Sequence, residues 1–560
     1  MPYSSPFPAL TIPKCNVLHY LFPQEKTPSD TPLWIDSKNT ERYLTPWSML
    51  QWTKRLAVGL DRIGSKPGEV VMIFTPNHIF VPVAYLGIVG SKRIFSGGNP
   101  AYTLSEMVHQ VTNTQAQILL AHPSLIKVAV AAARSAGLPE GRVFLFSDEP
   151  CVPVEGCRDW REFLPSQAEV KGYEFPTLSE NEATTTTATV NFSSGTTGLS
   201  KGVEVSHFNL IANSEQTIFM RSANKPWTAN TRPAERWISF LPLYHAYGQM
   251  YTMIMGQKLQ VPSYIMQKFD YPEFLRIIQD HKITHLQLAP PILIMLSKRP
   301  ETKNYDLSSI TDILSGGAPL SKELQNEITK MLGCEIIQGW GMTELTCAGT
   351  QVTGGTIDDS GSVGNLDPNC EARLLDDDGN EVPEGQPGDL YIRGPQVFLR
   401  YWRNPEATRE ALSPDGWLKT GDVAVAKKGW FWIVDRKKVT KYRSKDKELI
   451  KVNALQVAPA ELEAVLLQFD PIADAAAVGI MIDSQEWPRA YVTLKEEYKG
   501  KTTVEDIHKH MKEKVAKHKQ LVGGIVFVDE VPKLPSGKII RKLVKEWARK
   551  DAEKMNKAKL

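Results

Sequence analysis

The chain has 560 residues and a mass of 62.6 kDa, which is enough for roughly two to five structural units. Hydrophobic residues make up 42% and charged residues 23%, as in ordinary globular proteins, so a disordered, collagen-like or coiled-coil chain is excluded. The 65 basic and 63 acidic side chains nearly cancel, so we do not expect a strongly basic nucleic-acid binder.

Transmembrane and export signals are not expected. The most apolar stretch, Ile79 to Val89, is too short to span a bilayer and contains Pro82, so it predicts a buried helix. The N-terminus lacks the pattern of a secretory signal peptide. Six cysteines without C-x-x-C spacing indicate a reduced intracellular compartment and argue against a zinc site.

Short apolar runs alternate with longer amphipathic stretches early in the chain. The first examples are Glu69 to Thr75, Val81 to Gly90, Ala116 to Ala121 and Leu125 to Ala136. This alternation predicts βα units and mostly parallel sheets.

The sequence Asn191 to Gly202, NFSSGTTGLSKG, follows a predicted strand at Ala188 to Phe192. Its glycines allow close approach of the backbone to a phosphate, and its hydroxyls and Lys201 supply donors and charge. A Walker A loop requires glycine directly before the lysine, where Ser200 stands. The order of residues favours a phosphate-binding loop over a surface turn rich in serine and glycine.

The heptad Gln338 to Glu344, QGWGMTE, combines two glycines with Thr343 and an acid. The glycines permit a tight backbone path beside a flat ring, and the threonine hydroxyl can hydrogen bond to a phosphate. Glu344 is a hard oxygen ligand that suits Mg²⁺, which takes one or two carboxylates in addition to phosphate oxygens.

Two further motifs place an acid and an arginine close together in the sequence. Asp422 in DGWLKTGDVA can accept hydrogen bonds from both hydroxyls of a ribose, and Arg436 in WIVDRK can reinforce it. Either residue alone would equally suit a turn or a surface position.

Charge is unevenly distributed along the chain. Arg436 to Leu560 holds 27 basic and 18 acidic residues, a net +9, so the remainder carries −7. This basic part either has solvated lysine-rich helices or meets a polyanionic ligand. It contains PKLPSGKIIRK, in which Lys538 lies at the tip of a loop before a predicted helix, where it can stabilise charge in a transition state.

Taken together, these motifs resemble those of the adenylate-forming superfamily, and most closely the 4-coumarate–CoA ligase-like branch. The resemblance covers roughly Leu44 to Leu543 and includes LPLYHAYG, SGGAPLSKEL, RNPEAT and LQVAPAELE. It implies an α/β fold: a large multi-layered α/β N-terminal domain, residues 1–434, and a smaller mobile α+β domain, residues 436–560. The implied partners are ATP, Mg²⁺, coenzyme A and a carboxylic acid.

The resemblance also implies roles for individual residues. ATP would be bound by Ser193, Ser194, Gly195, Thr196, Thr197, Gly198, Lys201, Gly316, Gly317, Ala318, Pro319, Gln338, Gly339, Trp340, Gly341, Asp422, Arg436 and Gln456. The catalytic residues would be Lys538, His245, Thr343 and Glu344, with Glu344 as the metal ligand. The acid would be contacted by His245, Tyr247, Gly317, Gly341 and Thr346.

The implied reaction has two halves: acyl-AMP and pyrophosphate form first, and then a thiol, expected to be that of CoA, displaces AMP. Three departures from the family pattern are Ser200, an insertion of about nine residues before Glu448, and Asn453-Ala454 in place of Lys-Gly. Because of the insertion, the hinge residue could be Lys438 or Lys447. The alternatives are delivery of acyl-AMP to a carrier protein or to oxygen, and a non-catalytic scaffold.

The chain ends in Ala558-Lys559-Leu560, which resembles the peroxisomal address S-K-L. We therefore expect recognition by the peroxisomal import receptor rather than a merely frayed terminus. The identity of the acid, aryl or fatty, is not readable from the sequence.

Overall fold

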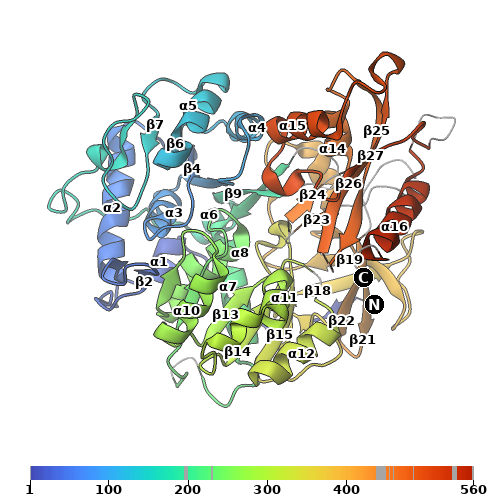
Figure 1. Cartoon of the computed structure of the whole chain (residues 1–560). Coiled ribbons are helices and arrows are strands. Elements are labelled where there is room, and N and C mark those ends of the chain that lie inside the picture. Colours follow the sequence, from blue (N-terminus) through green and yellow to red (C-terminus); the bar gives the residue numbers. More distant parts are fainter. Residues whose placement is uncertain are drawn as a thin grey trace. The chain divides into compact units, whose positions relative to one another are not determined.

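The computed structural model describes residues 2–193, 200–228, 231–318, 320–436, 450–452, 455–457, 459–483, 485–532 and 539–557. The chain forms two compact units, coloured along the sequence in Figure 1. The first comprises Met1–Pro100, Met107–Phe192 and Gly202–Asp435. The second comprises Ala101–Glu106, Ser193–Lys201 and Arg436–Leu560.

An eight-stranded sheet forms one layer of the large unit, with the order β20-β10-β9-β5-β4-β6-β7-β8. Neighbours run parallel from β9 to β8, whereas β10 and β20 are antiparallel. The strands are β4 (Val70–Phe74), β5 (Ile94–Gly98), β6 (Ile118–Ala121), β7 (Val143–Leu145), β8 (Arg158–Asp159), β9 (Thr187–Ser193), β10 (Lys201–Ser206) and β20 (Arg400–Tyr401).

A nine-stranded sheet follows the order β17-β16-β15-β14-β13-β11-β12-β2-β3 and is parallel from β15 to β2. Its two edges are antiparallel. The strands are β2 (Trp34–Asp36), β3 (Tyr43–Leu44), β11 (Trp237–Ser239), β12 (Ser263–Ile265), β13 (His285–Leu288), β14 (Asp312–Ser315), β15 (Glu335–Trp340), β16 (Thr350–Gln351) and β17 (Asn365–Leu366).

A third sheet has five strands and is antiparallel where its pairing is described. The predicted βα units and mostly parallel sheets did not include it. In β19 every second residue is buried, so one face of the strand packs on the core. The strands are β1 (Tyr3–Ser4), β18 (Glu371–Leu375), β19 (Pro387–Arg393), β21 (Leu418–Lys427) and β22 (Trp430–Arg436).

Helices cover these sheets, and the apolar helix predicted from the sequence is wholly buried. All ten residues of α3 (Val81–Gly90) are buried, and Pro82 lies in its first turn, where proline costs no helical hydrogen bond. The prediction of a buried helix is therefore confirmed. The other helices of eight or more residues in this unit are α2 (Pro46–Arg62), α4 (Leu104–Thr114), α5 (Ile126–Ser135), α7 (His207–Ser222), α10 (Tyr271–His281), α11 (Pro290–Lys298) and α12 (Lys322–Leu332).

Shorter helical segments connect these elements. They are α1 (Val17–Leu21), α6 (Glu180–Thr185), α8 (Ala246–Gly248), α9 (Gly256–Leu259), α13 (Pro405–Ala411), the π-helix η3 (Gln249–Met255), and the 3₁₀ helices η1 (Pro123–Leu125), η2 (Trp160–Phe163), η4 (Pro300–Asn304) and η5 (Thr343–Leu345).

The second unit mixes helices and strands around its own core. Helix α14 is joined to α16 by a buried ion pair, in which Arg541 donates to both carboxylate oxygens of Glu463 at 2.7 and 2.6 Å. Its elements are β23 (Ile450–Val452), β24 (Leu455–Val457), α14 (Pro459–Leu466), β25 (Ile472–Ile482), β26 (Gln485–Leu494), η6 (Glu496–Tyr498), α15 (Val504–Lys514), η7 (Lys517–Lys519), β27 (Ile525–Phe527) and α16 (Arg541–Lys557).

The predicted fold class, α/β with a smaller α+β domain, is confirmed by these elements. Strands β4 and β6 and helices α3 and α5 lie where the apolar alternation of residues 69–136 placed them. No helix within the described part of the chain is long and apolar enough to cross a membrane.

A carboxyl group is buried without full compensation at the edge of the nine-stranded sheet. Asp367 is inaccessible to solvent, and its Oδ1 accepts a hydrogen bond from Gln351 Nε2 at 3.2 Å. Its Oδ2 has no partner among the described residues. Burial raises the pKa of Asp367 from 3.8 to about 7, because the charged form loses its hydration.

The free energy of unfolding should therefore fall as the pH rises from about 4 to about 7. Between about pH 4 and pH 7 the unfolded chain has lost this proton and the folded chain retains it, so folding weakens by about 1.4 kcal/mol per pH unit from this group. Asp367→Asn should remove that slope and make the large unit more stable at pH 8. Urea unfolding at pH 5 and pH 8 measures this, with Asp378→Asn, an exposed position, as the control. Equal stabilities of wild type and Asp367→Asn at pH 8 would contradict it.

Candidate functional site

Two predicted motifs meet at the carboxyl ends of β14 and β15. These strands are parallel neighbours in which Ser315 is opposite Gln338, so the residues after each strand lie together. A Cβ on Gly316 would lie 3.7 Å from the carbonyl oxygen of Gly339, and Gly317 has a positive φ of 80°. The edge formed by the carboxyl ends of parallel strands is where ligands bind in open α/β sheets.

The Gln338 side chain points into the protein. It donates to Gln325 Oε1 at 2.6 Å and to the carbonyl oxygen of Leu320 at 3.4 Å. Its amide group therefore fixes helix α12 against β15, and a ligand would meet the backbone here. Ala318 lies within the described residues beside Gly317, and Pro319 lies outside them.

Trp340 and Asp422 are in direct contact. The indole Nε1 of Trp340 donates to Asp422 Oδ2 at 3.0 Å, which joins the end of β15 to the middle of β21. Asp422 is 5% exposed and lies at a β-bulge between β19 and β21. The bulge is held by Thr420, whose hydroxyl donates to the carbonyl oxygen of Leu390 at 2.7 Å and accepts from the Asp422 amide at 3.1 Å. Bulges commonly redirect a side chain beside an active site.

Glu344 is buried and held by a residue that the sequence reasoning missed. Its Oε1 accepts a hydrogen bond from the Tyr401 hydroxyl at 2.8 Å, and its carbonyl oxygen accepts from the amide of Phe398 at 2.9 Å. Thr343 is also buried, in the same 3₁₀ helix. A single carboxylate fits Mg²⁺ that is held mainly by phosphate oxygens. Nothing in the local sequence around Tyr401 signals this contact, because the partners are 57 residues apart.

The backbone around Glu344 tolerates little change. A Cβ on Gly341 would lie 1.8 Å from the carbonyl oxygen of Cys347, so only glycine fits. Thr346 has a positive φ of 64°, a strained conformation for a β-branched residue, and its hydroxyl donates to the carbonyl oxygen of Gln396 at 2.8 Å. Strain of this kind gathers at functional sites.

His245 and Tyr247 begin the segment that faces β14. The His245 ring is exposed, yet desolvation by the atoms around it lowers its pKa, so the imidazole is neutral at pH 7. Its Nδ1 accepts from the amide of Tyr247 at 3.3 Å. The Tyr247 hydroxyl donates to the carbonyl oxygen of Leu314 at 3.2 Å, and its ring would lie 3.7 Å from a Cβ on Gly316. This contact joins two of the residues expected to contact the acid or ATP.

Two side-chain amides hold the segment that begins at His245, and the sequence did not predict this contact. Asn191 in β9 and Gln249 in η3 exchange two hydrogen bonds at 2.9 and 3.0 Å, and Gln249 also donates to the carbonyl oxygen of Tyr244 at 3.0 Å. Asn191 is the first residue of the Ser/Thr/Gly motif, so the only available signal was its position there.

The remaining predicted site residues are reported more briefly. Ser193 ends β9 and Lys201 begins β10, while Arg436 ends β22 and Gln456 lies in β24. Ser194, Gly195, Thr196, Thr197, Gly198 and Lys538 lie outside the described residues, as do the hinge candidates Lys438 and Lys447 and the pair Asn453-Ala454. Their roles stay predictions.

The contact of Trp340 with Asp422 can be tested directly. Trp340→Phe keeps an aromatic ring and removes one donor to the carboxylate expected to bind ribose, so the KM for ATP should rise about tenfold. Acid-dependent exchange of pyrophosphate into ATP measures it. The control is Trp160→Phe, since the buried indole nitrogen of Trp160 has no partner among the described residues. The same KM for ATP in Trp340→Phe and wild type would contradict the expectation.

Comparisons with known proteins identify the family. Residues 23–402 match the model of the AMP-binding enzyme family, and residues 461–538 match the AMP-binding enzyme C-terminal domain. An acyl-CoA synthetase of Alternaria alternata is 35% identical over 95% of this chain and 91% of its own length. A phenylacetyl-CoA ligase of Aspergillus niger is 31% identical, over 96% and 98%.

Solved structures share the fold. An amide bond synthetase from Marinactinospora thermotolerans has a TM-score of 0.80 and 22% identity, covering 95% of this chain and 99% of that one. An anthranilate CoA ligase with bound anthranoyl-AMP has a TM-score of 0.67 and 23% identity, covering 97% and 99%. The family matches, together with relatives above 30% identity along nearly the whole chain, show that this protein belongs to the AMP-binding enzyme family.

Proposed function

We propose that the chain activates a carboxylic acid with ATP, releases pyrophosphate, and transfers the acyl group from acyl-AMP to coenzyme A. Membership of the family, together with relatives that are acyl-CoA synthetases and CoA ligases, supports an AMP-forming acid–CoA ligase. The observation that carries the proposal is that Trp340, Asp422, Glu344 and Tyr247, expected at one site, are each fixed by contacts at or beside the carboxyl ends of β14 and β15.

In the adenylation half, the chain would mainly position its substrates and neutralise charge. Asp422, held by Trp340, would accept the ribose hydroxyls. Glu344 would supply the carboxylate ligand of a Mg²⁺ ion that lowers the charge of the phosphates. The loop from Ser193 to Lys201 would bind those phosphates. A neutral His245 would lie beside the acid without adding a charge.

We assign residues 1–434 to the adenylation domain and residues 436–560 to a smaller domain that supplies Lys538 and Gln456. Its net charge of +9 suits ligands that are all polyanions: ATP, pyrophosphate and coenzyme A. The rival function is transfer of the acyl group to an acceptor other than coenzyme A. It is favoured by Asn453-Ala454, since the added methyl and restricted φ of alanine stand where the family has glycine.

Two assays test the proposal on the purified full chain. Acid-dependent exchange of pyrophosphate into ATP reports adenylation, and release of AMP with thioester in the presence of coenzyme A reports the second half. We expect both activities. Exchange without thioester would support the rival acceptor, and the absence of exchange across a broad panel of acids would support a scaffold.

Lys538→Ala should reduce exchange by at least a hundredfold while ATP binding is largely kept, because the lost charge acts on the transition state rather than on ground-state ATP. ATP binding is measured by calorimetry. Lys554→Ala, a lysine in the last helix, is the matched control and should be active. Undiminished exchange in Lys538→Ala would refute the assigned role.

We also propose that Ala558-Lys559-Leu560 directs the chain to peroxisomes. A fluorescent reporter carrying the last twelve residues should collect in peroxisomes, and the same reporter without the final leucine should remain diffuse. A diffuse signal from the complete tail would dismiss the assignment.

A further inference from the structure

A pocket lies on the same face of the nine-stranded sheet as the proposed site. It is lined by residues that include Gln287 of β13 and Asp312 and Leu314 of β14. Alternate residues of a strand project from one face, so Asp312 and Leu314 share a face with Gly316. Each pair of residues advances about 7 Å along a strand, so the pocket begins one pleat away from Gly316.

Aromatic side chains connect the pocket to the proposed site. Tyr247, which contacts Gly316, packs edge-on against Tyr251 with ring centroids 5.3 Å apart, and Tyr251 lines the pocket. Tyr251 lies in the π-helix η3, and π-helical turns are frequent at functional sites. An acid with its carboxylate near Gly316 would therefore extend along this face toward the pocket.

The side-chain amide of Gln287 in the pocket has no partner among the described residues. Gln287 is only 5% exposed, and its amide makes no hydrogen bond to any residue within the described part of the chain. Its neighbour across the ladder is Leu314. Because Gln287 lines the pocket, a ligand that covers its amide gains free energy by pairing with it and loses free energy by leaving it unpaired.

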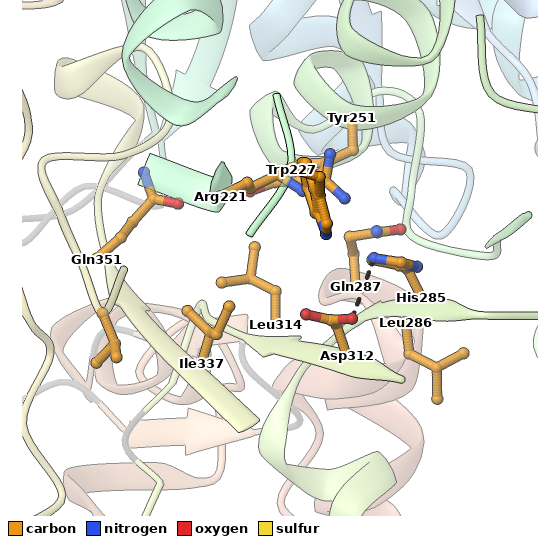
Figure 2. Close-up of a pocket in the computed structure, with 11 residues that line it drawn as sticks. Arg221, Trp227, Tyr251, His285, Leu286, Gln287, Asp312, Leu314, Ile337 and Gln351 are labelled. Atoms are coloured by element: carbon orange, nitrogen blue, oxygen red, sulfur yellow. Dashed lines mark ion pairs between the residues drawn. The ribbon is translucent and has the colours of Figure 1, made fainter. Parts of the chain in front are cut away.

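Other donors surround Gln287. Figure 2 shows the pocket with the labelled side chains of Arg221, Trp227, Tyr251 and Gln287. Arg221 uses one nitrogen for Glu235 at 2.7 Å, and the Tyr251 hydroxyl is not paired with any described residue. A guanidinium and an indole can only donate hydrogen bonds. The pocket thus suits a group that accepts them.

The charged groups of the pocket are balanced by neighbouring charges. Asp312 is paired with Lys225 at 2.8 Å and lies 3.2 Å from His285 Nε2. Burial lowers the pKa of His285 to about 4, so it is neutral at pH 7. Glu235 pairs with Arg221 and Arg232. Because these charges offset one another, the matching group is a neutral oxygen rather than a second carboxylate.

We propose that Gln287 is a specificity-determining residue, and that its amide, with Tyr251 and Arg221, binds a hydroxyl or carbonyl oxygen at the far end of the acid. The oxygen could be carried by an aryl ring or by an alkyl chain. An acid with a bare hydrocarbon end would cover the Gln287 amide without pairing it, and sites built to bind a substrate hydroxyl reject analogues without it strongly. This inference rests on the proposed activation of a carboxylic acid.

The test compares matched pairs of acids in the pyrophosphate exchange assay with the full chain. The pairs are phenylacetate with 4-hydroxyphenylacetate, 3-phenylpropanoate with its 4-hydroxy form, and octanoate with 8-hydroxyoctanoate. We expect kcat/KM for the oxygenated member to exceed that of its partner at least tenfold in one series, and that series identifies the carrier of the oxygen.

Gln287→Met, similar in length but without the amide, should bring that ratio to about one and leave the KM for ATP unchanged. It should not lower the melting temperature, because no hydrogen bond with a described residue is lost. A merely structural glutamine would instead lower the melting temperature and reduce activity with every acid alike. Gln279→Met, at a half-buried helical position outside the pocket lining, is the control and should keep the wild-type ratio.

Two kinds of outcome would overturn the inference. If wild type uses the acids but shows no preference for the oxygenated member, or if Gln287→Met keeps the preference, Gln287 does not bind an oxygen at the far end of the acid. If no acid supports exchange, the proposed function itself fails and the inference fails with it. The two failures are distinguishable because the first leaves exchange intact.

Discussion

The hydrogen bond between Trp340 and Asp422 is the contact on which the proposed nucleotide site depends. It joins the nine-stranded sheet to the five-stranded sheet, because Trp340 ends β15 and Asp422 lies in β21. A charge-assisted bond of this kind fixes both the indole plane and the carboxylate. Its loss would remove one contact that sets the carboxylate expected to meet the ribose relative to the glycines at the ends of β14 and β15.

The backbone around Trp340 packs closely against its indole. A Cβ on Gly349 would lie 3.0 Å from the Trp340 ring, and the Gly349 amide donates to the carbonyl oxygen of Trp340 at 3.0 Å. On the other side of Trp340, Gly341 allows the Cys347 carbonyl to approach more closely than any side chain would permit. The glycines therefore act through sterics: they let the chain fold tightly around one aromatic residue.

Local pattern explains what could be predicted from the sequence. Apolar periodicity located β4, α3, β6 and α5, since it reflects burial within a single element. The motif residues were each recognised by chemistry, but their mutual contacts were not, because Trp340 and Asp422 are 82 residues apart. The contact of Tyr401 with Glu344 joins residues that are distant in the sequence. The β-bulge at Asp422 depends on how β19 and β21 are aligned, and the alternating pattern of a single strand does not specify its alignment with a partner strand.

The two ends of the proposed acid site along β14 differ in whether their polar side chains have hydrogen-bond partners within the protein. Near Gly316, the Tyr247 hydroxyl is already paired with the Leu314 carbonyl, so the protein completes its own hydrogen bonds where the reaction is expected. One pleat further, the Gln287 amide has no partner among the described residues. A ligand that fills the pocket covers this amide, and an unpaired polar group that binding removes from water costs free energy. A ligand with an oxygen at that position avoids the cost, so the Gln287 amide would select the substrate.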